Sequence, residues 1–129
     1  MPNNQKANRA FFIDDEPAFL ELYSTKFKSA GFEVQTCSEP ASAIEEAIQF
    51  KPDIIFLDLV MANVDGIGLL KKFKTNTETQ WIPIIMLSNI NNEADRKECE
   101  QEGASQFLIK SSFTPGELLD YGKKVLAMI

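Results

Sequence analysis

The sequence contains no histidine, and this absence narrows the chemistry open to the protein. Histidine-based acid–base catalysis and most zinc sites need an imidazole, so both classes are excluded. Cysteine is scarce as well, because Cys37 and Cys99 are the two in the chain and they form no CxxC pair. We therefore expect two reduced, buried thiols in a cytoplasmic protein, without a disulfide.

Long apolar runs and excess positive charge are also missing. No run of about 18 apolar residues occurs, so we expect no membrane insertion. The net charge of −6 argues against direct binding to nucleic acid, which favours a basic surface.

The opening residues lack the apolar centre of a signal peptide. We expect residues 1–8 to form a flexible tail and residues 9–129 to form one domain, a normal size for a single core.

Five short apolar runs are typical of β-strands that are covered on both faces. They span residues 9–13, 32–36, 54–59, 82–87 and 106–109. Strands of this kind belong to sheets with helices on both sides, which requires helices in the intervals between them.

Helical periodicity occupies those intervals. The first helix carries apolar residues from Phe19 to Phe27 and is expected to stop at Gly31, and the last is expected to begin at Thr114-Pro115. Segment 91–102 reads NNEADRKECEQE, so its apolar stripe is narrow and its packing weak. The alternation predicts an α/β fold, a single doubly wound (βα)5 domain with a five-stranded parallel sheet.

Polar side chains follow four of the predicted strands. They are Asp14 with Asp15, then Asp58, Ser88 and Lys110. Ligands bind at the carboxyl edge of such sheets, so we expect these side chains to converge. Asp58 is the most informative, because a carboxylate between apolar residues loses hydration.

Three acids in one pocket need a counter-ion. Two carboxylates about 4 Å apart repel by roughly 4 kcal/mol at an effective dielectric of about 20. Lys110 supplies one positive charge, and Mg²⁺ suits the remaining oxygen ligands. Asp58 could then be a nucleophile for a phosphoryl group, with Lys110 and Ser88 contacting its oxygens. Taken alone, Asp15 is expected to be a helix N-cap, and the Asp14-Asp15 pair alone fits either capping or metal binding.

Together these residues resemble the receiver domain of two-component response regulators, the CheY-like family. The resemblance covers residues 9–129 and includes VMANVDG after Asp58 and SSFTPGELL after Lys110. It implies a flavodoxin-like fold with strand order 2-1-3-4-5. It also implies that Asp58 is the phosphoacceptor and that Asp14, Asp15, Asp58 and the backbone carbonyl of Val60 hold Mg²⁺.

The resemblance assigns further roles. It makes Ser88 the hydroxyl that follows the phosphoryl group, Lys110 the cation that contacts it, and Phe107 the aromatic switch residue. It implies a sensor histidine kinase or a histidine phosphotransfer protein as donor. A downstream protein partner would bind the face of helix 91–102, strand 106–109 and the last helix.

The sequence also departs from the family's usual pattern. Val60 and Ile90 are apolar at positions that flank the phosphoryl group, which predicts slow self-dephosphorylation. Phe107 has no hydroxyl, so its switching would depend on packing. Ser111 follows Lys110 where many relatives have proline, which leaves the isomer of that peptide bond open.

Two other functions were weighed. A Mg²⁺-dependent aspartyl-phosphate phosphohydrolase would place a second acid two residues after its nucleophile, where this chain has Val60. A flavin-binding module would need a phosphate loop after the first strand, but DDEPAF is acidic. The expected function is therefore a signalling switch rather than an enzyme, with at most self-phosphorylation and slow self-dephosphorylation.

Overall fold

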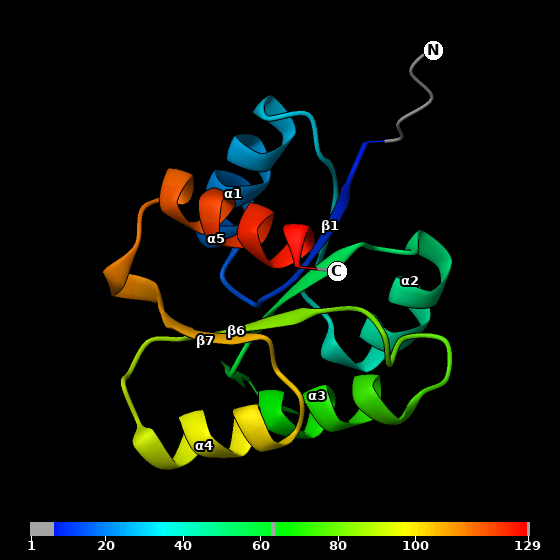
Figure 1. Ribbon diagram of the computed structural model, residues 1–129, viewed down its shortest axis with the longest axis vertical. Helices are drawn as coiled ribbons and strands as arrows, with labels where there is room; N and C mark the ends of the chain where they lie inside the picture. Colours follow the sequence, from blue (N-terminus) through cyan, green and yellow to red (C-terminus); the bar gives the residue numbers. More distant parts are fainter. Residues whose placement is uncertain (1–6, 63, 129) are drawn as a thin grey trace.

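The computed structural model describes residues 7–62 and 64–128, which form a central sheet between two layers of helices (Figure 1). Residues 1–6 of the expected tail, and Ile129, which the sequence assigned to the expected last helix, lie outside this range. Five long strands make up the sheet: β1 (Arg9–Ile13), β2 (Glu33–Cys37), β3 (Ile54–Asp58), β6 (Ile84–Ser88) and β7 (Gln106–Ile109).

All neighbouring strands of this sheet are parallel, in the order β2-β1-β3-β6-β7. Counted over the five long strands, this is the expected 2-1-3-4-5 order. The predicted strand positions were right to within two residues at each end. The largest shift is at β6, which begins at Ile84 because Ile82-Pro83 belongs to the preceding turn.

The described residues contain five α-helices, as the periodicity predicted: four connect successive strands of the sheet, and the fifth follows β7. They are α1 (Pro17–Ser29), α2 (Ala43–Phe50), α3 (Gly66–Thr75), α4 (Glu93–Gln101) and α5 (Pro115–Ala127). Short 3-10 turns, η1 (Pro40–Ser42) and η2 (Lys110–Ser112), precede α2 and α5. No helix of the described residues is long and apolar enough to cross a membrane.

The helix ends follow the predicted signals. Gly31, just beyond α1, has a φ of 94°, a backbone conformation that favours glycine. Thr114 caps α5 and exchanges hydrogen bonds with Glu117 in a capping box. Both helices pack against the same side of the sheet, on one apolar core.

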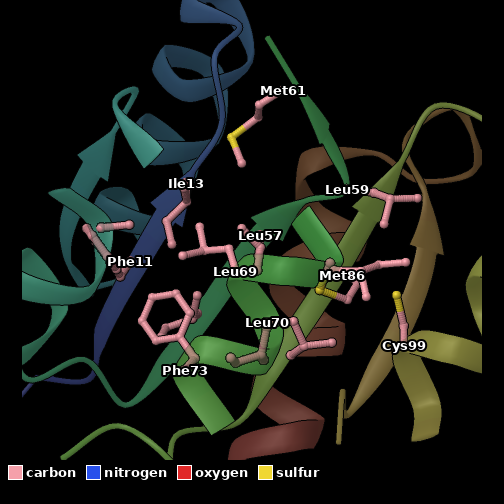
Figure 2. Close-up of a cluster of buried hydrophobic side chains, with 14 of the residues drawn as sticks. Phe11, Ile13, Leu57, Leu59, Met61, Leu69, Leu70, Phe73, Met86 and Cys99 are labelled. Atoms are coloured by element: carbon pink, nitrogen blue, oxygen red, sulfur yellow. The ribbon is translucent and has the colours of Figure 1, made fainter. Parts of the chain in front are cut away.

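Alternate residues of the strands feed two apolar cores. In β3, Ile55 and Leu57 face the core shared with α2, α3 and α4, whereas Ile54 and Phe56 face the core under α1 and α5. Figure 2 shows the first core, where side chains of β1, β3 and β6 meet those of α3 and Cys99 of α4. The parallel strands therefore end together at one edge, which positions the polar residues that follow them.

One element was not predicted. A two-residue hairpin, β4 (Val60–Met61) with β5 (Val64–Asp65), follows directly after β3. Strands of two residues are too short for their alternation to be recognised in the sequence.

Candidate functional site

The predicted convergence of polar side chains is present at the carboxyl edge of the sheet. Asp14 follows β1, Asp58 ends β3, Ser88 ends β6, and Lys110 follows β7 as the first residue of η2. Asp14, Asp58 and Ser88 are each buried, with at most 2% of the residue exposed. Two carboxyl groups and a hydroxyl are therefore held away from bulk water.

Lys110 joins the two buried carboxyl groups. Its Nζ atom lies 2.7 Å from Asp14 Oδ2 and 3.5 Å from Asp58 Oδ1, and it also reaches Glu16 Oε1 at 2.8 Å. The same nitrogen lies 4.4 Å from the centre of the Phe19 ring, a cation–π contact. With 7% of its side chain exposed, Lys110 is part of the site and not a solvated strand end.

Burial and neighbouring charges shift the pKa values of Asp14, Asp58 and Lys110. Burial, with the nearby charge of Asp14, raises the pKa of Asp58 to about 6, although Lys110 acts in the opposite direction. Burial also raises the pKa of Asp14 despite its hydrogen bond from Lys110. Burial lowers the pKa of Lys110, but its hydrogen bonds to Asp14 and Glu16 outweigh this, so the net shift is upward.

The two aspartates after β1 accept hydrogen bonds from different parts of the chain. Asp14 Oδ1 accepts a hydrogen bond from the Glu16 amide at 2.9 Å, and Asp15 Oδ2 accepts one from the Ala62 amide at 2.8 Å. Asp15 therefore joins the loop between β1 and α1 to the hairpin after β3. The residue at the N-cap of α1 is Glu16, and its side chain makes no capping bond, so the capping interpretation of Asp15 was wrong.

Asp14, Glu16 and Asp58 form a group of oxygen donors suited to a hard cation. One oxygen from each lies within 4.8 Å of the others, a spacing that could hold a metal ion. Sequence reasoning missed Glu16, although the run Asp14-Asp15-Glu16 offered a third acid. Asp15 has a second oxygen besides the one bonded to Ala62, so its predicted role as a ligand remains a prediction, as does that of the Val60 carbonyl.

Gly66 allows α3 to begin directly against the end of β3, which carries Asp58. A Cβ atom at this position would overlap the carbonyl oxygen of Asp58 and lie 2.6 Å from the carbonyl oxygen of Leu59. The Gly66 amide donates to that Leu59 oxygen at 2.8 Å, and Asp65 caps the helix through the Ile67 amide. The sequence Val64-Asp65-Gly66 thus closes the loop between Asp58 and α3.

Ser88 and Phe107 lie one on each of two paired strands, β6 and β7. Ser88 Oγ donates to the Ile90 carbonyl at 2.8 Å and accepts from the Ile90 amide at 3.2 Å. Phe107 is 4% exposed, and the Arg96 guanidinium carbon lies 4.8 Å from its ring centre. Sequence reasoning missed Arg96, because its partner lies on a strand that only the fold brings close.

Two apolar side chains stand at the rim of the site. Val60 is 68% exposed and Ile90 is 59% exposed.

The Lys110-Ser111 peptide bond, whose isomer the sequence left open, is trans, like every other in the described chain.

Comparison with known proteins identifies this arrangement. The family model described as the response regulator receiver domain matches residues 10–122, most of the chain. The chain belongs to this family. Asp14, Asp58, Ser88 and Lys110 lie at strand ends of this receiver domain, and their individual roles remain predictions.

Relatives agree with this membership. The chain is 32% identical over 102 residues to the DNA-binding dual master transcriptional regulator RpaA of Synechocystis sp., an alignment that covers 79% of the chain and 42% of RpaA. The chain thus spans less than half the length of this curated relative.

Solved structures show the same fold. A putative response regulator from Chloroflexus aurantiacus has a TM-score of 0.86 at 26% identity, covering 95% of this chain and 99% of that one. The chemotaxis response regulator CheY4 of Vibrio cholerae has a TM-score of 0.85 at 25% identity, covering 93% and 99%.

Proposed function

We propose that this receiver domain is a phosphorylation-dependent signalling switch whose phosphoacceptor is Asp58. The observation that carries the proposal is the buried Asp58 carboxylate held beside Lys110 and Asp14 at the carboxyl edge of the sheet. A phosphoryl group needs mainly positioning and neutralisation of charge, and this cluster offers both.

The transfer would form an acyl phosphate on Asp58. A carboxylate oxygen of Asp58 attacks the phosphorus of a phosphohistidine, the P–N bond breaks, and the electron pair stays with the donor imidazole, which takes up a proton. Because these 129 residues include no histidine, the phosphohistidine belongs to a sensor histidine kinase or a histidine phosphotransfer protein. Lys110 would stabilise one phosphoryl oxygen, and Ser88 could donate to another after leaving Ile90.

We propose Mg²⁺ as the cofactor, because the site has hard oxygen donors and an excess of negative charge. Asp14 and Asp58 would hold it, with Glu16, the second oxygen of Asp15 and the Val60 carbonyl as further candidate ligands. A bound cation would neutralise charge on the transferring phosphoryl group. It would also favour the ionised form of Asp58, which is the nucleophile.

The proposed output is a conformational change on the face of α4, β7 and α5, read by a protein partner. We propose no enzymatic activity beyond self-phosphorylation and slow self-dephosphorylation. The relative RpaA is named as DNA-binding, and this chain covers 42% of it. The absence of direct nucleic-acid binding by these residues therefore remains a prediction, supported by their net charge of −6.

Incubation with Mg²⁺ and acetyl phosphate, read by intact mass, tests the proposal. A single phosphoryl adduct is expected on the parent and on Asp120→Asn, a matched control at an exposed acid of α5. Asp58→Asn should abolish the adduct. No adduct on the parent, or an adduct that persists in Asp58→Asn, would refute Asp58 as acceptor. Trp81 is 83% exposed at the opposite edge of the sheet, so it is a poor reporter for this site.

A further inference from the structure

Helix α4 is held to the body of the protein by few contacts. Among its nine residues, Glu93–Gln101, Cys99 alone is buried. Figure 2 shows Cys99 entering the core near Met86. An exposed ion pair between Lys71 and Glu98, 3.3 Å apart, adds little, because surface pairs of this kind contribute at most about 1 kcal/mol. Arg96 supplies further contacts between α4 and the rest of the protein.

Arg96 reaches three separate parts of the protein. Its guanidinium group covers the Phe107 ring, and its Nη1 atom donates to the Phe107 carbonyl at 3.1 Å. Nη2 donates to Asn91 Oδ1 at 3.4 Å, in the loop that follows β6. Nε lies 3.9 Å from Glu93 Oε2. One planar cation therefore connects β7, the β6–α4 loop and α4.

The same loop is hydrogen-bonded to the hydroxyl of the site. Ser88 Oγ is bonded to both backbone groups of Ile90, the residue next to Asn91. For Ser88 to contact a phosphoryl group on Asp58, its hydrogen must leave the Ile90 carbonyl. The backbone of Ile90 and Asn91 would then rearrange. This movement would weaken or break the hydrogen bond between Asn91 and Arg96.

We propose that Arg96 is a positioning residue that stabilises the resting conformation of the β6–α4 loop and of Phe107, and that its release transmits phosphorylation to α4. This inference rests on the proposed function of Asp58. The two states are the resting protein and the phosphorylated protein. Because Phe107 has no hydroxyl, a hydrogen bond from its ring cannot favour either state. In the proposal, the contacts of Arg96 with Phe107 favour the resting state instead. A ligand or a residue biases an equilibrium between two states only through a difference in free energy between its contacts in them.

The role requires more than attachment of a helix. If Arg96 contacted Phe107 and Asn91 equally in both states, its loss would lower stability without changing the balance between them. If it stabilises the resting state, its loss raises the fraction of protein that is competent to bind the phosphoryl group. Apparent affinity rises in proportion to that fraction.

The first test measures the affinity of Mg²⁺ with beryllofluoride, a phosphoryl mimic, for the parent, Arg96→Ala, Arg96→Lys and Lys97→Ala. Arg96→Ala should bind about three- to tenfold tighter, as expected for the loss of one cation–π contact and its hydrogen bonds. Arg96→Lys should fall between the parent and Arg96→Ala, because it keeps the charge and loses the planar contacts. Lys97→Ala, an exposed neighbour on α4, should match the parent.

A double-mutant cycle connects the effect to the loop. In an Asn91→Ala background, replacement of Arg96 by alanine should tighten binding less than it does in the parent. Equal affinity for Arg96→Ala and Lys97→Ala, or weaker binding by Arg96→Ala, would overturn the inference and leave Arg96 as a structural contact.

A second measurement uses no phosphoryl mimic. Ring resonances of Phe107, followed by NMR with labelled phenylalanine in the metal-free protein, should shift and broaden in Arg96→Ala and remain unchanged in Lys97→Ala. An unchanged Phe107 ring in Arg96→Ala overturns the inference by itself. Failure of the parent to bind the mimic would refute the proposed function, whereas the ring measurement would still decide the role of Arg96.

Discussion

The side-chain nitrogen of Lys110 lies 2.7 Å from Asp14 Oδ2, and both side chains are almost completely buried. This pair supports the site before any phosphoryl group arrives, because it offsets part of the negative charge around Asp58. Removal of one partner from a buried ion pair leaves an uncompensated charge.

Lys110→Gln should therefore destabilise the metal-free protein by about 3 kcal/mol at pH 7, measured by urea unfolding with a chelator present. Lys123→Gln, at an exposed position of α5, should change stability by less than about 0.5 kcal/mol. Saturating Mg²⁺ should recover part of the loss, because the cation replaces the missing charge. Equal stabilities of the two variants would show that Lys110 is not needed to hold the acids.

The pH dependence of stability should reveal Asp58. Its pKa of about 6 in the folded protein exceeds that of an unfolded aspartate, near 4, so the folded state binds more protons between these values. The contribution of Asp58 to stability is thus most favourable below about pH 4 and is lost as the pH rises through 6.

Asp58→Asn should remove this contribution. In metal-free buffer its stability should exceed that of the parent by about 3 kcal/mol at pH 7, and the difference should shrink toward zero near pH 4. Urea unfolding at a series of pH values measures the difference directly. A difference that does not vary with pH would contradict the raised pKa.

Gly66→Ala should disrupt the loop that carries Asp58. The added Cβ would meet backbone atoms of Asp58 and Leu59, which cannot move aside as a flexible side chain can. We expect a loss of about 2 kcal/mol or more in the free energy of unfolding, with a lower rate of phosphorylation.

Gly68→Ala is the matched control on the same helix. Nothing lies within 4 Å of a Cβ at Gly68, so alanine there should stabilise α3 by about 0.5–1 kcal/mol. Opposite signs for the two variants would establish close approach at Gly66; the same sign for both would contradict it.

The phosphoryl lifetime should depend on Val60 and Ile90. Both side chains are exposed at the rim of the site, and neither can orient an attacking water. Val60→Asn and Ile90→Glu should lose phosphate roughly tenfold faster than the parent, read by intact mass after removal of the donor. Leu22→Asn, an exposed apolar position on α1, is the control. Unchanged lifetimes in both variants would show that Val60 and Ile90 do not slow self-dephosphorylation.

The sequence predicted the fold well because its signals are local. Apolar runs such as Ile54–Leu57 and caps such as Thr114 act through near neighbours, and parallel strands then require their ends to meet. The two-residue strands of the hairpin after Asp58 were missed because their pairing has no period to detect.

The candidate site was predicted as a set of positions, but its contacts depend on distant parts of the chain. Lys110 reaches Glu16 and Phe19, and Arg96 reaches the carbonyl of Phe107, because the fold places those residues together. Taken alone, Glu16 and Arg96 resemble ordinary surface charges, and no local pattern distinguishes them.

The Phe56 side chain of β3 has a further consequence, for the order in which parts of the molecule open. Its ring stacks on Phe12 at 4.6 Å and meets the edge of Phe27 at 5.2 Å, beneath Gly122 of α5. Amide hydrogens of β3 should therefore exchange with solvent only through global unfolding, whereas those of α4 should exchange through local opening. The proposed phosphoacceptor, Asp58, is thus attached to the segment expected to open last, and the helix proposed to carry its signal is expected to be among the first to open.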